Sequence, residues 1–269
     1  MSALLVVTRI AGVATVQDGG RPGRAHQGVP PGGALVPELL ARANAAVRNA
    51  RGAAAIESFG SLTLEARAEV RVASDDGVAH TLAAGASLTM ASDGVRVRYV
   101  AVRGGIDVPE VLGGRGTLLV ASLGGHEGRA LRRGDALRAG DAAAVDAPMP
   151  DPPDRSARVR VIPGPDGARF PAEALELLVS STFLVEARSD RVGIRLSGPS
   201  LPRLGSDSGV SSPMVRGAIQ VPPSGMPVVL GPDHPTTGGY PVLATVITAD
   251  FGSLAARPPG ARVRFVAEP

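Results

Sequence analysis

Residues 218–248, AIQVPPSGMPVVLGPDHPTTGGYPVLATVIT, contain short apolar runs separated by turns rich in proline and glycine. The runs at 218–221, 228–230 and 244–248 alternate with these turns, as short β-strands do. The same pattern recurs along most of the chain. It predicts a mainly β fold whose strands close as a barrel or as paired sheets.

Further strands are predicted on both sides of this stretch. Apolar residues alternate with polar ones at 62–64, 70–72 and 95–101. Apolar runs also predict strands at 3–10, 158–162, 184–187, 192–196 and 261–266. Only two short helices are predicted, one at 37–49, where Pro37 suits the first helical position, and one at 171–180.

A proline-rich segment, 148–158, divides the sequence into two halves. Its composition, PMPDPPDRSAR, is typical of a linker. We therefore expect two β subdomains, an N-terminal one at 1–147 and a C-terminal one at 159–269. Strands from both halves could still share a sheet, because a linker in the sequence need not be a boundary in the fold.

The composition fits a folded protein and excludes several chemistries. Glycine (35) and proline (24) are frequent among the 269 residues, but 44% of the residues are hydrophobic, so we interpret them as turns rather than disorder. All 28 basic residues are arginine. Without lysine the chain cannot supply a Walker A lysine, a Schiff base or a biotinyl group, and without cysteine it has no thiol nucleophile or disulfide.

The charge balance and the aromatic content limit the possible partners. The net charge is +3, from 28 basic and 25 acidic residues, and five Phe with two Tyr are too few for base stacking, so we expect no nucleic-acid partner. Charge-free runs are short, and the run 217–232 contains four prolines, so no membrane helix is expected. The first residues, MSALLVVTRI, lack a signal-peptide pattern, which favours a cytoplasmic protein.

Familiar catalytic motifs are absent from the sequence. It contains no GxSxG, HExxH or GxGxxG, and His26, His80, His126 and His234 are widely spaced. A metal site assembled by folding stays open, but we predict no metal ligand. The candidate chemistry lies in three glycine-bounded polar loops, which we call the first loop (15–33), the second loop (103–135) and the third loop (218–241).

The first loop supplies Gln17, Asp18, Arg21 and His26 among glycines that allow the backbone to approach a ligand closely. These polar side chains could equally satisfy the backbone of a structural Ω-like loop. The sequence leaves both interpretations open.

The second loop places Arg103, Arg115 and Arg129 beside glycines. Guanidinium groups next to exposed backbone amides suit a carboxylate or a phosphate. The alternative is a set of ordinary hairpin turns with surface arginines, whose ion pairs contribute little.

The third loop ends in a polar turn before a strand. A substrate could meet both hydroxyl groups and backbone amides there, and the residues concerned are Asp233, Thr236, Thr237, Gly238, Gly239 and Tyr240. A purely structural turn would not obviously need two threonines, two glycines and a tyrosine together.

Eight motifs in and between these loops resemble one known family. They are, in chain order, TVQDGGRPG, HQGVPPGGA, AAIES around Glu57, RGGIDVP, GGHEGRAL, SDRVGIRLSGP, GAIQVPPSG and TTGGYP. At these residues the sequence is similar to the biotin-dependent carboxyltransferase-like family. This family contains KipA, the C subunit of 5-oxoprolinase (PxpC), allophanate hydrolase subunit 2 and the carboxyltransferase region of urea carboxylase. The resemblance extends over nearly the whole chain.

This resemblance implies a cyclophilin-like β-barrel architecture and a partner protein, the KipI-like PxpB. The leading hypothesis is the PxpC component of a bacterial ATP-dependent 5-oxoprolinase, which opens 5-oxoproline to glutamate together with the lactam-utilisation protein PxpA, with ATP and Mg²⁺ bound by the complex. One alternative is the carboxyltransferase component of a biotin-dependent urea or amide carboxylase, with biotin supplied by another chain. Another is a non-catalytic antagonist of a KipI-like protein.

Under the leading hypothesis the candidate catalytic residues are Asp18, Glu57 and Asp233, as bases or Mg²⁺ ligands. The candidate substrate-binding residues are Gln17, Arg21, His26, Arg103, Arg115, Arg129, Thr236, Thr237, Gly238, Gly239 and Tyr240. These assignments require that the three loops line a single recess completed by a second protein.

Overall fold

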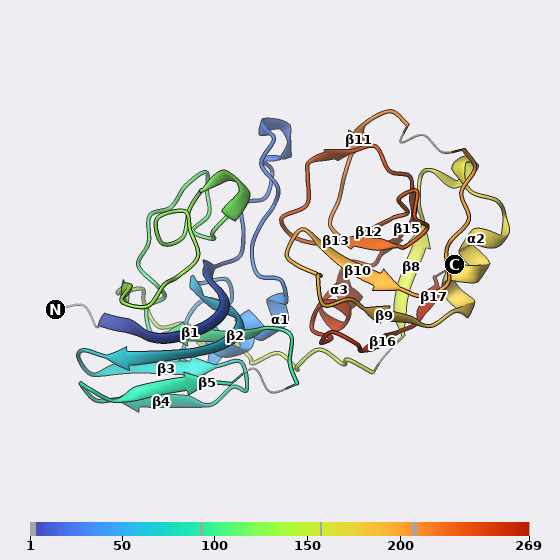
Figure 1. The fold of residues 1–269 in the computed structure, drawn as a ribbon. Helices are drawn as coiled ribbons and strands as arrows, with labels where there is room; N and C mark the ends of the chain where they lie inside the picture. Colours follow the sequence, from blue (N-terminus) through green and yellow to red (C-terminus); the bar gives the residue numbers. More distant parts are fainter. Residues whose placement is uncertain (1–3, 92–93, 157, 206–208, 269) are drawn as a thin grey trace. The chain divides into compact units, whose positions relative to one another are not determined.

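The computed structural model describes residues 4–91, 94–156, 158–205 and 209–268, and the chain divides into two compact units (Figure 1). Unit 1 comprises the chain up to Pro22 together with Gly32–Pro153. Unit 2 comprises Gly23–Pro31 together with Asp154–Pro269. The first loop therefore contributes residues to both units. Ala157, in the predicted linker, lies outside the described residues.

In the described part of the chain, unit 1 is built around a seven-stranded antiparallel sheet that curves into a half-barrel (Figure 1). The strand order is β4-β3-β6-β2-β1-β7, and β5 also pairs with β2. The strands are β1 Leu4–Gln17, β2 Ala55–Ala66, β3 Val70–Ser74, β4 Ala79–Leu82, β5 Ser87–Met90, β6 Arg98–Val102 and β7 Ala136–Arg138.

Strand β1 is longer than predicted, because it continues past Ile10 to Gln17. Gly12 lies opposite Gly60 in the pairing of β1 with β2. Both glycines have positive φ, and a Cβ on Gly12 would lie 2.0 Å from the carbonyl oxygen of Phe59. Only glycine permits this close approach, so these two glycines keep the strands paired beyond the predicted end at Ile10. The pairing carries β1 to the start of the first loop.

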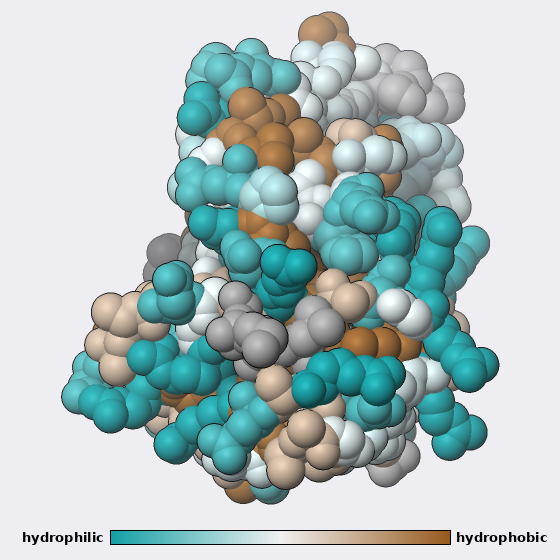
Figure 2. Space-filling model, turned by 90° about the vertical axis from the view of Figure 1, so that its left-hand side faces the viewer, coloured by the Kyte–Doolittle hydropathy of each residue, from teal (hydrophilic) through white to brown (hydrophobic). Residues whose placement is uncertain are grey.

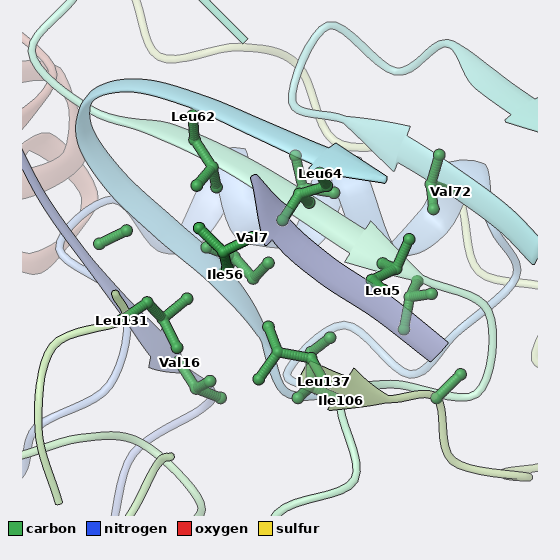
Figure 3. Packing of buried hydrophobic residues seen from close by; sticks show 14 of the residues in the cluster. Leu5, Val7, Val16, Ile56, Leu62, Leu64, Val72, Ile106, Leu131 and Leu137 are labelled. Atoms are coloured by element: carbon green, nitrogen blue, oxygen red, sulfur yellow. The ribbon is translucent and has the colours of Figure 1, made fainter. Parts of the chain in front are cut away.

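The hydrophobic core of unit 1 includes side chains from the sheet and from the second loop. Figure 3 shows Leu5, Val7 and Leu64 of β1 and β2 together with Ile106 and Leu131. Each fully buried side chain of this size contributes about 1.5–3 kcal/mol of hydrophobic stabilisation. Because Ile106 and Leu131 lie near its two ends, the second loop is anchored in the core rather than free at the surface.

Unit 2 contains, among its described residues, an eight-stranded sheet that forms a nearly closed barrel. The order is β16-β9-β10-β13-β12-β15-β8-β17. The end strands β16 and β17 are separated in the chain only by Arg264, so the sheet must curl until its two edges approach each other. The strands are β8 Val159–Pro163, β9 Phe183–Val185, β10 Gly193–Ser197, β12 Ala218–Gln220, β13 Val228–Leu230, β15 Val242–Val246, β16 Arg262–Val263 and β17 Phe265–Ala267, and a separate pair is β11 Ser212–Pro213 with β14 Thr237–Gly238.

The described residues form three α-helices, so the prediction of two was one short. The helices are α1 Pro37–Ala46, α2 Glu173–Ser180 and α3 Thr248–Ala255, and the short 3₁₀ turns are η1 Ala25–Gln27, η2 Leu119–Ala121 and η3 Gly167–Arg169. Helix α3 has weak local signals, because Gly252 lies inside it. Tertiary contacts stabilise it instead: Phe251 and Leu254 are buried, and Asp250 forms an ion pair with Arg160 of β8 at 2.7 Å.

The prediction of a mainly β, barrel-forming fold is confirmed. Of the helices in the described residues, none has the length and apolar character needed to cross a membrane.

Candidate functional site

The first and second loops meet at the end of β1. The side-chain Nε2 of Gln17 donates a hydrogen bond to the carbonyl oxygen of Thr117 at 2.9 Å. Asp18 accepts hydrogen bonds from the backbone N–H groups of Gly20 at 2.8 Å and Arg115 at 2.6 Å. Hydrogen bonds to a charged acceptor contribute about 1.5–3 kcal/mol each, so this contact fixes the position of the carboxylate. The structure therefore brings these two loops together.

Arg21 also joins the first loop to the second. Its side chain is buried, and Nη2 donates to the carbonyl oxygen of Gly116 at 2.6 Å, while Nε donates to that of Val111 at 3.3 Å. A buried guanidinium is costly unless such acceptors satisfy its donors. These bonds fix the backbone of the second loop, and a direct contact between Arg21 and substrate stays a prediction.

A recess of about 310 Å³ lies within unit 1 where the two loops meet. Glycine-rich backbone forms much of its wall, and four acidic residues contribute to it: Asp18, Asp107, Glu110 and Asp141. Arg115 is the basic residue of the lining, and its Nη1 donates to the carbonyl oxygen of Val108. The recess therefore presents mainly hydrogen-bond acceptors, which suits a ligand that carries N–H or O–H donors.

Sequence reasoning missed three of these acidic residues. Asp107 lies inside the motif RGGIDVP, and Glu110 follows it directly. The available signal for Asp107 and Glu110 was their place after a glycine turn. Asp141 lies after strand β7, and no pattern in the sequence distinguishes it. Their shared recess depends on the tertiary fold.

Arg103 and Asn49 hold a neighbouring part of the second loop. Arg103 Nη1 donates to Asn49 Oδ1 at 3.3 Å and to the carbonyl oxygen of Ala142 at 3.0 Å. Asn49 is buried, and its Nδ2 donates to the carbonyl oxygen of Val102 at 2.7 Å. Arg103 thus contacts the chain's own oxygens beside the recess, and its predicted role toward substrate stays a prediction.

Arg129 lies in a cluster of charged side chains of the second loop. Its guanidinium contacts Asp135 at 2.7 Å and Glu127 at 2.7 Å, and His126 Nε2 lies 3.5 Å from Asp135. The hydrogen bond from Arg129 holds the pKa of Asp135 below its ordinary value. His126 and Glu127 also line a second recess of about 410 Å³ in unit 1, whereas Arg129 does not line either recess. The geometry gives Arg129 a structural contact with two carboxylates.

Glu57 is completely buried in β2. Its Oε2 accepts a hydrogen bond from the hydroxyl group of Tyr99 at 2.5 Å and another from the backbone N–H of Leu35 at 2.8 Å. The Tyr99 hydroxyl oxygen in turn accepts the N–H of Val36 at 3.0 Å. Glu57 lines neither recess, and these contacts fix the segment that leads into α1. Its predicted catalytic role stays a prediction.

In unit 2, Asp233 forms a buried ion pair with Arg191. The guanidinium donates to both carboxylate oxygens, at 2.7 Å and 2.9 Å, and both side chains are 7% exposed. Bidentate geometry of this kind fixes the position of both groups. Arg191 lies in the motif SDRVGIRLSGP, but sequence reasoning did not single it out.

His234, next to Asp233, is a second residue that sequence reasoning did not select. Its Nδ1 lies 2.8 Å from the carbonyl oxygen of Pro235, which favours the tautomer with the proton on Nδ1. Burial lowers the pKa of His234, and the positive charge of Arg216 acts in the same direction. The imidazole is therefore neutral near pH 7.

The rest of the third loop forms a surface turn of unit 2. Thr237 and Gly238 form strand β14, and the carbonyl oxygen of Thr236 accepts a hydrogen bond from the N–H of Met214 at 3.0 Å. Gly239 follows, and Tyr240 is 41% exposed. His26 of the first loop is exposed in η1, which also belongs to unit 2. The prediction that this loop shares a recess with the other two stays a prediction.

In the described part of the chain, no group of three or more His, Cys, Asp or Glu side chains is arranged to hold a metal ion.

Comparison with known proteins shows the family to which the chain belongs. The family described as carboxyltransferase domain, subdomain A and B, matches residues 27–267. The chain belongs to this carboxyltransferase family. Within it, the chain is 36% identical to the C subunit of 5-oxoprolinase from Escherichia coli, over 98% of this chain and 91% of that protein. It is 31% identical to the C subunit of 5-oxoprolinase from Haemophilus influenzae, over 94% of this chain and 88% of that protein.

A solved structure shows the same carboxyltransferase fold. Urea carboxylase of Kluyveromyces lactis superimposes with a TM-score of 0.87 and 27% identity, over 100% of this chain. The chain spans only 27% of that larger protein. The resemblance to the carboxyltransferase family predicted from the eight motifs is confirmed.

Proposed function

We propose that this chain is the PxpC component of a bacterial, cytoplasmic, ATP-dependent 5-oxoprolinase. In this proposal it acts with the KipI-like protein PxpB and the lactam-utilisation protein PxpA to open 5-oxoproline to glutamate. The observation that carries the proposal is the 36% identity to the Escherichia coli protein over 98% of this chain.

The recess of unit 1 is the proposed place for the small substrate. Its volume of about 310 Å³ is at the lower end of the range that small-molecule sites occupy. Asp18 lines it and is held by two backbone N–H groups, so its carboxylate is fixed before a ligand arrives. In the proposal Asp18 accepts a proton or a hydrogen bond from the substrate, whereas Glu57 and Asp233 position the loops around their own partners.

Exposed apolar residues of the second loop support a partner protein. Val120 is 84% exposed, and Leu112 and Leu119 are each 40% exposed. In Figure 2, hydrophobic residues gather on the upper part of the face in view and are bordered by hydrophilic ones. Large apolar groups that remain in water commonly mark a surface that a second protein covers.

The lining of the recess does not fit a nucleoside triphosphate such as ATP. Four acidic residues would face the phosphates, and the guanidinium of Arg115 already donates to a backbone oxygen. The chain also has no lysine to hold a phosphate. We therefore propose that ATP and Mg²⁺ bind to another protein of the complex, and no chemical step on this chain is assigned to them.

The proposal is tested by mixing the purified chain with PxpA and PxpB and measuring ATP hydrolysis with and without 5-oxoproline. We expect the lactam to stimulate hydrolysis only when all three chains are present. Omitting each protein in turn is the control. Hydrolysis that does not respond to 5-oxoproline in the complete mixture would contradict the proposal.

A second candidate is a carboxyltransferase component that acts on urea or a similar amide. The superposition with urea carboxylase of Kluyveromyces lactis favours it. Because the chain has no lysine, biotin would have to arrive on a separate carrier protein. Carboxylation of urea by a mixture of this chain, PxpB, a biotin carboxylase and a biotinylated carrier, without a response to 5-oxoproline, would support this candidate over the first.

A further inference from the structure

The second recess of unit 1 has no part in the proposed function. Its volume of about 410 Å³ lies within the range that small-molecule sites occupy. Charged side chains of both signs line it, from Asp107, Glu127 and Arg138, together with the apolar residues Pro109 and Val111. The recess that Asp18 lines is mainly acidic. The two recesses therefore suit ligands of different charge.

Asp107 and Arg138 lie opposite each other on two neighbouring segments. An antiparallel bridge joins Ile106 to Ala139, and the N–H of Asp107 donates to the carbonyl oxygen of Arg138 at 2.8 Å. Residues that lie opposite each other in an antiparallel pair have side chains on the same face, with Cβ atoms about 4.5–5.5 Å apart. Both residues line the second recess. The fold thus places a carboxylate and a guanidinium side by side at its wall.

Both of these charged groups are available to a ligand. Asp107 and Arg138 are exposed, and in the part of the chain that the structure describes neither side chain forms an ion pair or a hydrogen bond with another residue. The other charged groups of the lining have partners. Glu127 contacts Arg129 at 2.7 Å, and His126 Nε2 lies 3.5 Å from Asp135.

A zwitterionic ligand matches the pair. In an α-amino acid the ammonium and carboxylate groups are bonded to the same carbon atom, so an acidic and a basic side chain a few Å apart can bind both. A guanidinium donates two parallel hydrogen bonds to a carboxylate, and a carboxylate accepts from an ammonium group. A ligand with carboxylates alone would be repelled by Asp107 and Glu127, and an amine would leave Arg138 without a partner. Pro109 and Val111 offer apolar surface to an aliphatic side chain.

We propose that the second recess binds a zwitterionic α-amino acid with an aliphatic side chain. Its carboxylate contacts Arg138, and its ammonium group contacts Asp107. This site goes beyond the proposed function and does not depend on it. Because Asp107 also lines the recess that contains Asp18, an amino acid bound here holds one of the acidic residues of that recess.

Three matched ligands test the site. L-norvaline carries both charged groups, pentanoate lacks the ammonium group, and butylamine lacks the carboxylate. Binding of each to the full chain is measured by isothermal titration calorimetry at pH 7. We expect norvaline to bind at least about tenfold more tightly than either of the others, because only norvaline satisfies both side chains. Equal binding of norvaline and one of the others, or no binding of norvaline, would overturn the proposal.

Matched variants locate the ligand. We expect Arg138→Gln and Asp107→Asn each to weaken norvaline binding at least about tenfold, because each removes one charged partner. Arg133→Gln is the first control, since Arg133 is exposed in the same loop and lines neither recess. Asp141→Asn is the second, since Asp141 lines only the recess that contains Asp18. Both controls should bind norvaline as the parent does, and the circular dichroism spectra of all four variants should match that of the parent.

Two results from the variants would contradict the assignment. Unchanged affinity in Arg138→Gln would show that its guanidinium does not bind the carboxylate. An equal loss of affinity in Asp141→Asn would place the ligand in the other recess.

The outcomes also separate this inference from the proposed function. ATP hydrolysis that depends on 5-oxoproline, without any binding of norvaline, would support the proposed function and remove this site. Selective binding of norvaline without lactam-dependent hydrolysis would do the reverse.

Discussion

Asp18 of unit 1 and Asp233 of unit 2 are equally buried loop carboxylates with different partners. Asp18 is 7% exposed and accepts two backbone N–H groups, and it lines a recess. Asp233 is 8% exposed, and both of its oxygens are occupied by the guanidinium of Arg191. Backbone amides hold a carboxylate without cancelling its full charge, whereas a bidentate guanidinium neutralises it. From this difference we predict a ligand-binding role for Asp18 and a structural role for Asp233.

The largest expected effect comes from removing the partner of Asp233. Arg191→Ala leaves a buried carboxylate without its cation, and we expect the free energy of unfolding to fall by about 3–5 kcal/mol. Urea denaturation followed by circular dichroism measures this change. The control is Arg188→Ala, which breaks an exposed contact with Glu186 and should leave the transition midpoint unchanged. Equal midpoints for the two variants would refute a structural role for Asp233.

Substitution of Asp18 should affect turnover more than stability. Asp18→Asn loses the negative charge and one acceptor for the N–H groups of Gly20 and Arg115, and we expect lactam-dependent ATP hydrolysis by the complex to fall at least about 100-fold. The matched control is Asp76→Asn. Asp76 Oδ1 accepts the N–H of Val78 in an exposed turn, and asparagine can keep that bond. Turnover above half the parent value in Asp18→Asn would contradict the proposed ligand-binding role of Asp18.

The smallest expected effect is a pH dependence of the free energy of unfolding, contributed by His234, the residue next to Asp233. The pKa of His234 is below its ordinary value in the folded chain, chiefly because the ring is buried. Below about pH 6.5 the unfolded chain binds a proton at this histidine that the folded chain does not bind. Lowering the pH therefore lowers the free energy of unfolding until the folded-state pKa of His234 is reached. The slope is at most about 1.4 kcal/mol per pH unit for one such group.

His234→Gln should remove this part of the slope between pH 7 and the folded-state pKa, because glutamine does not titrate. Unfolding curves at a series of pH values measure it, and His80→Gln in exposed β4 is the control that should keep the parent slope. An unchanged slope in His234→Gln would show that other groups govern the acid sensitivity near Asp233.

The sequence predicted secondary structure well where apolar residues and turns alternate. The strands at 192–196 and 228–230 lie close to β10 and β13, because each short apolar run is enclosed by turn residues. It failed for α3, where Gly252 weakens the helix signal and burial of Phe251 decides the outcome. It also ended β1 too early, since a pair of facing glycines cannot be recognised before the register of two strands is known.

At the candidate site, too, the sequence indicated the residue types, whereas their contacts depend on the tertiary structure. Polar residues among glycines in the first loop led to the prediction that Gln17 binds substrate and Asp18 is catalytic; the structure joins both residues to the second loop, and these roles stay predictions. Arg103 and Arg129, predicted as anion-binding groups, and Arg21, predicted to bind substrate, all contact the chain's own oxygens, and their roles toward a substrate stay predictions. Their residue type was visible in the sequence, but their partners lie far away along the chain or within the same loop at positions that only folding specifies.

The sequence by itself determined the mainly β class, the absence of lysine and cysteine chemistry, and the family, because these depend on composition, on local periodicity and on ordered motifs. Only the tertiary structure decided which carboxylate faces a recess and which is neutralised by an arginine. Hydrogen bonds and ion pairs form between groups many residues apart, so a side chain's chemistry is set by its neighbours in space.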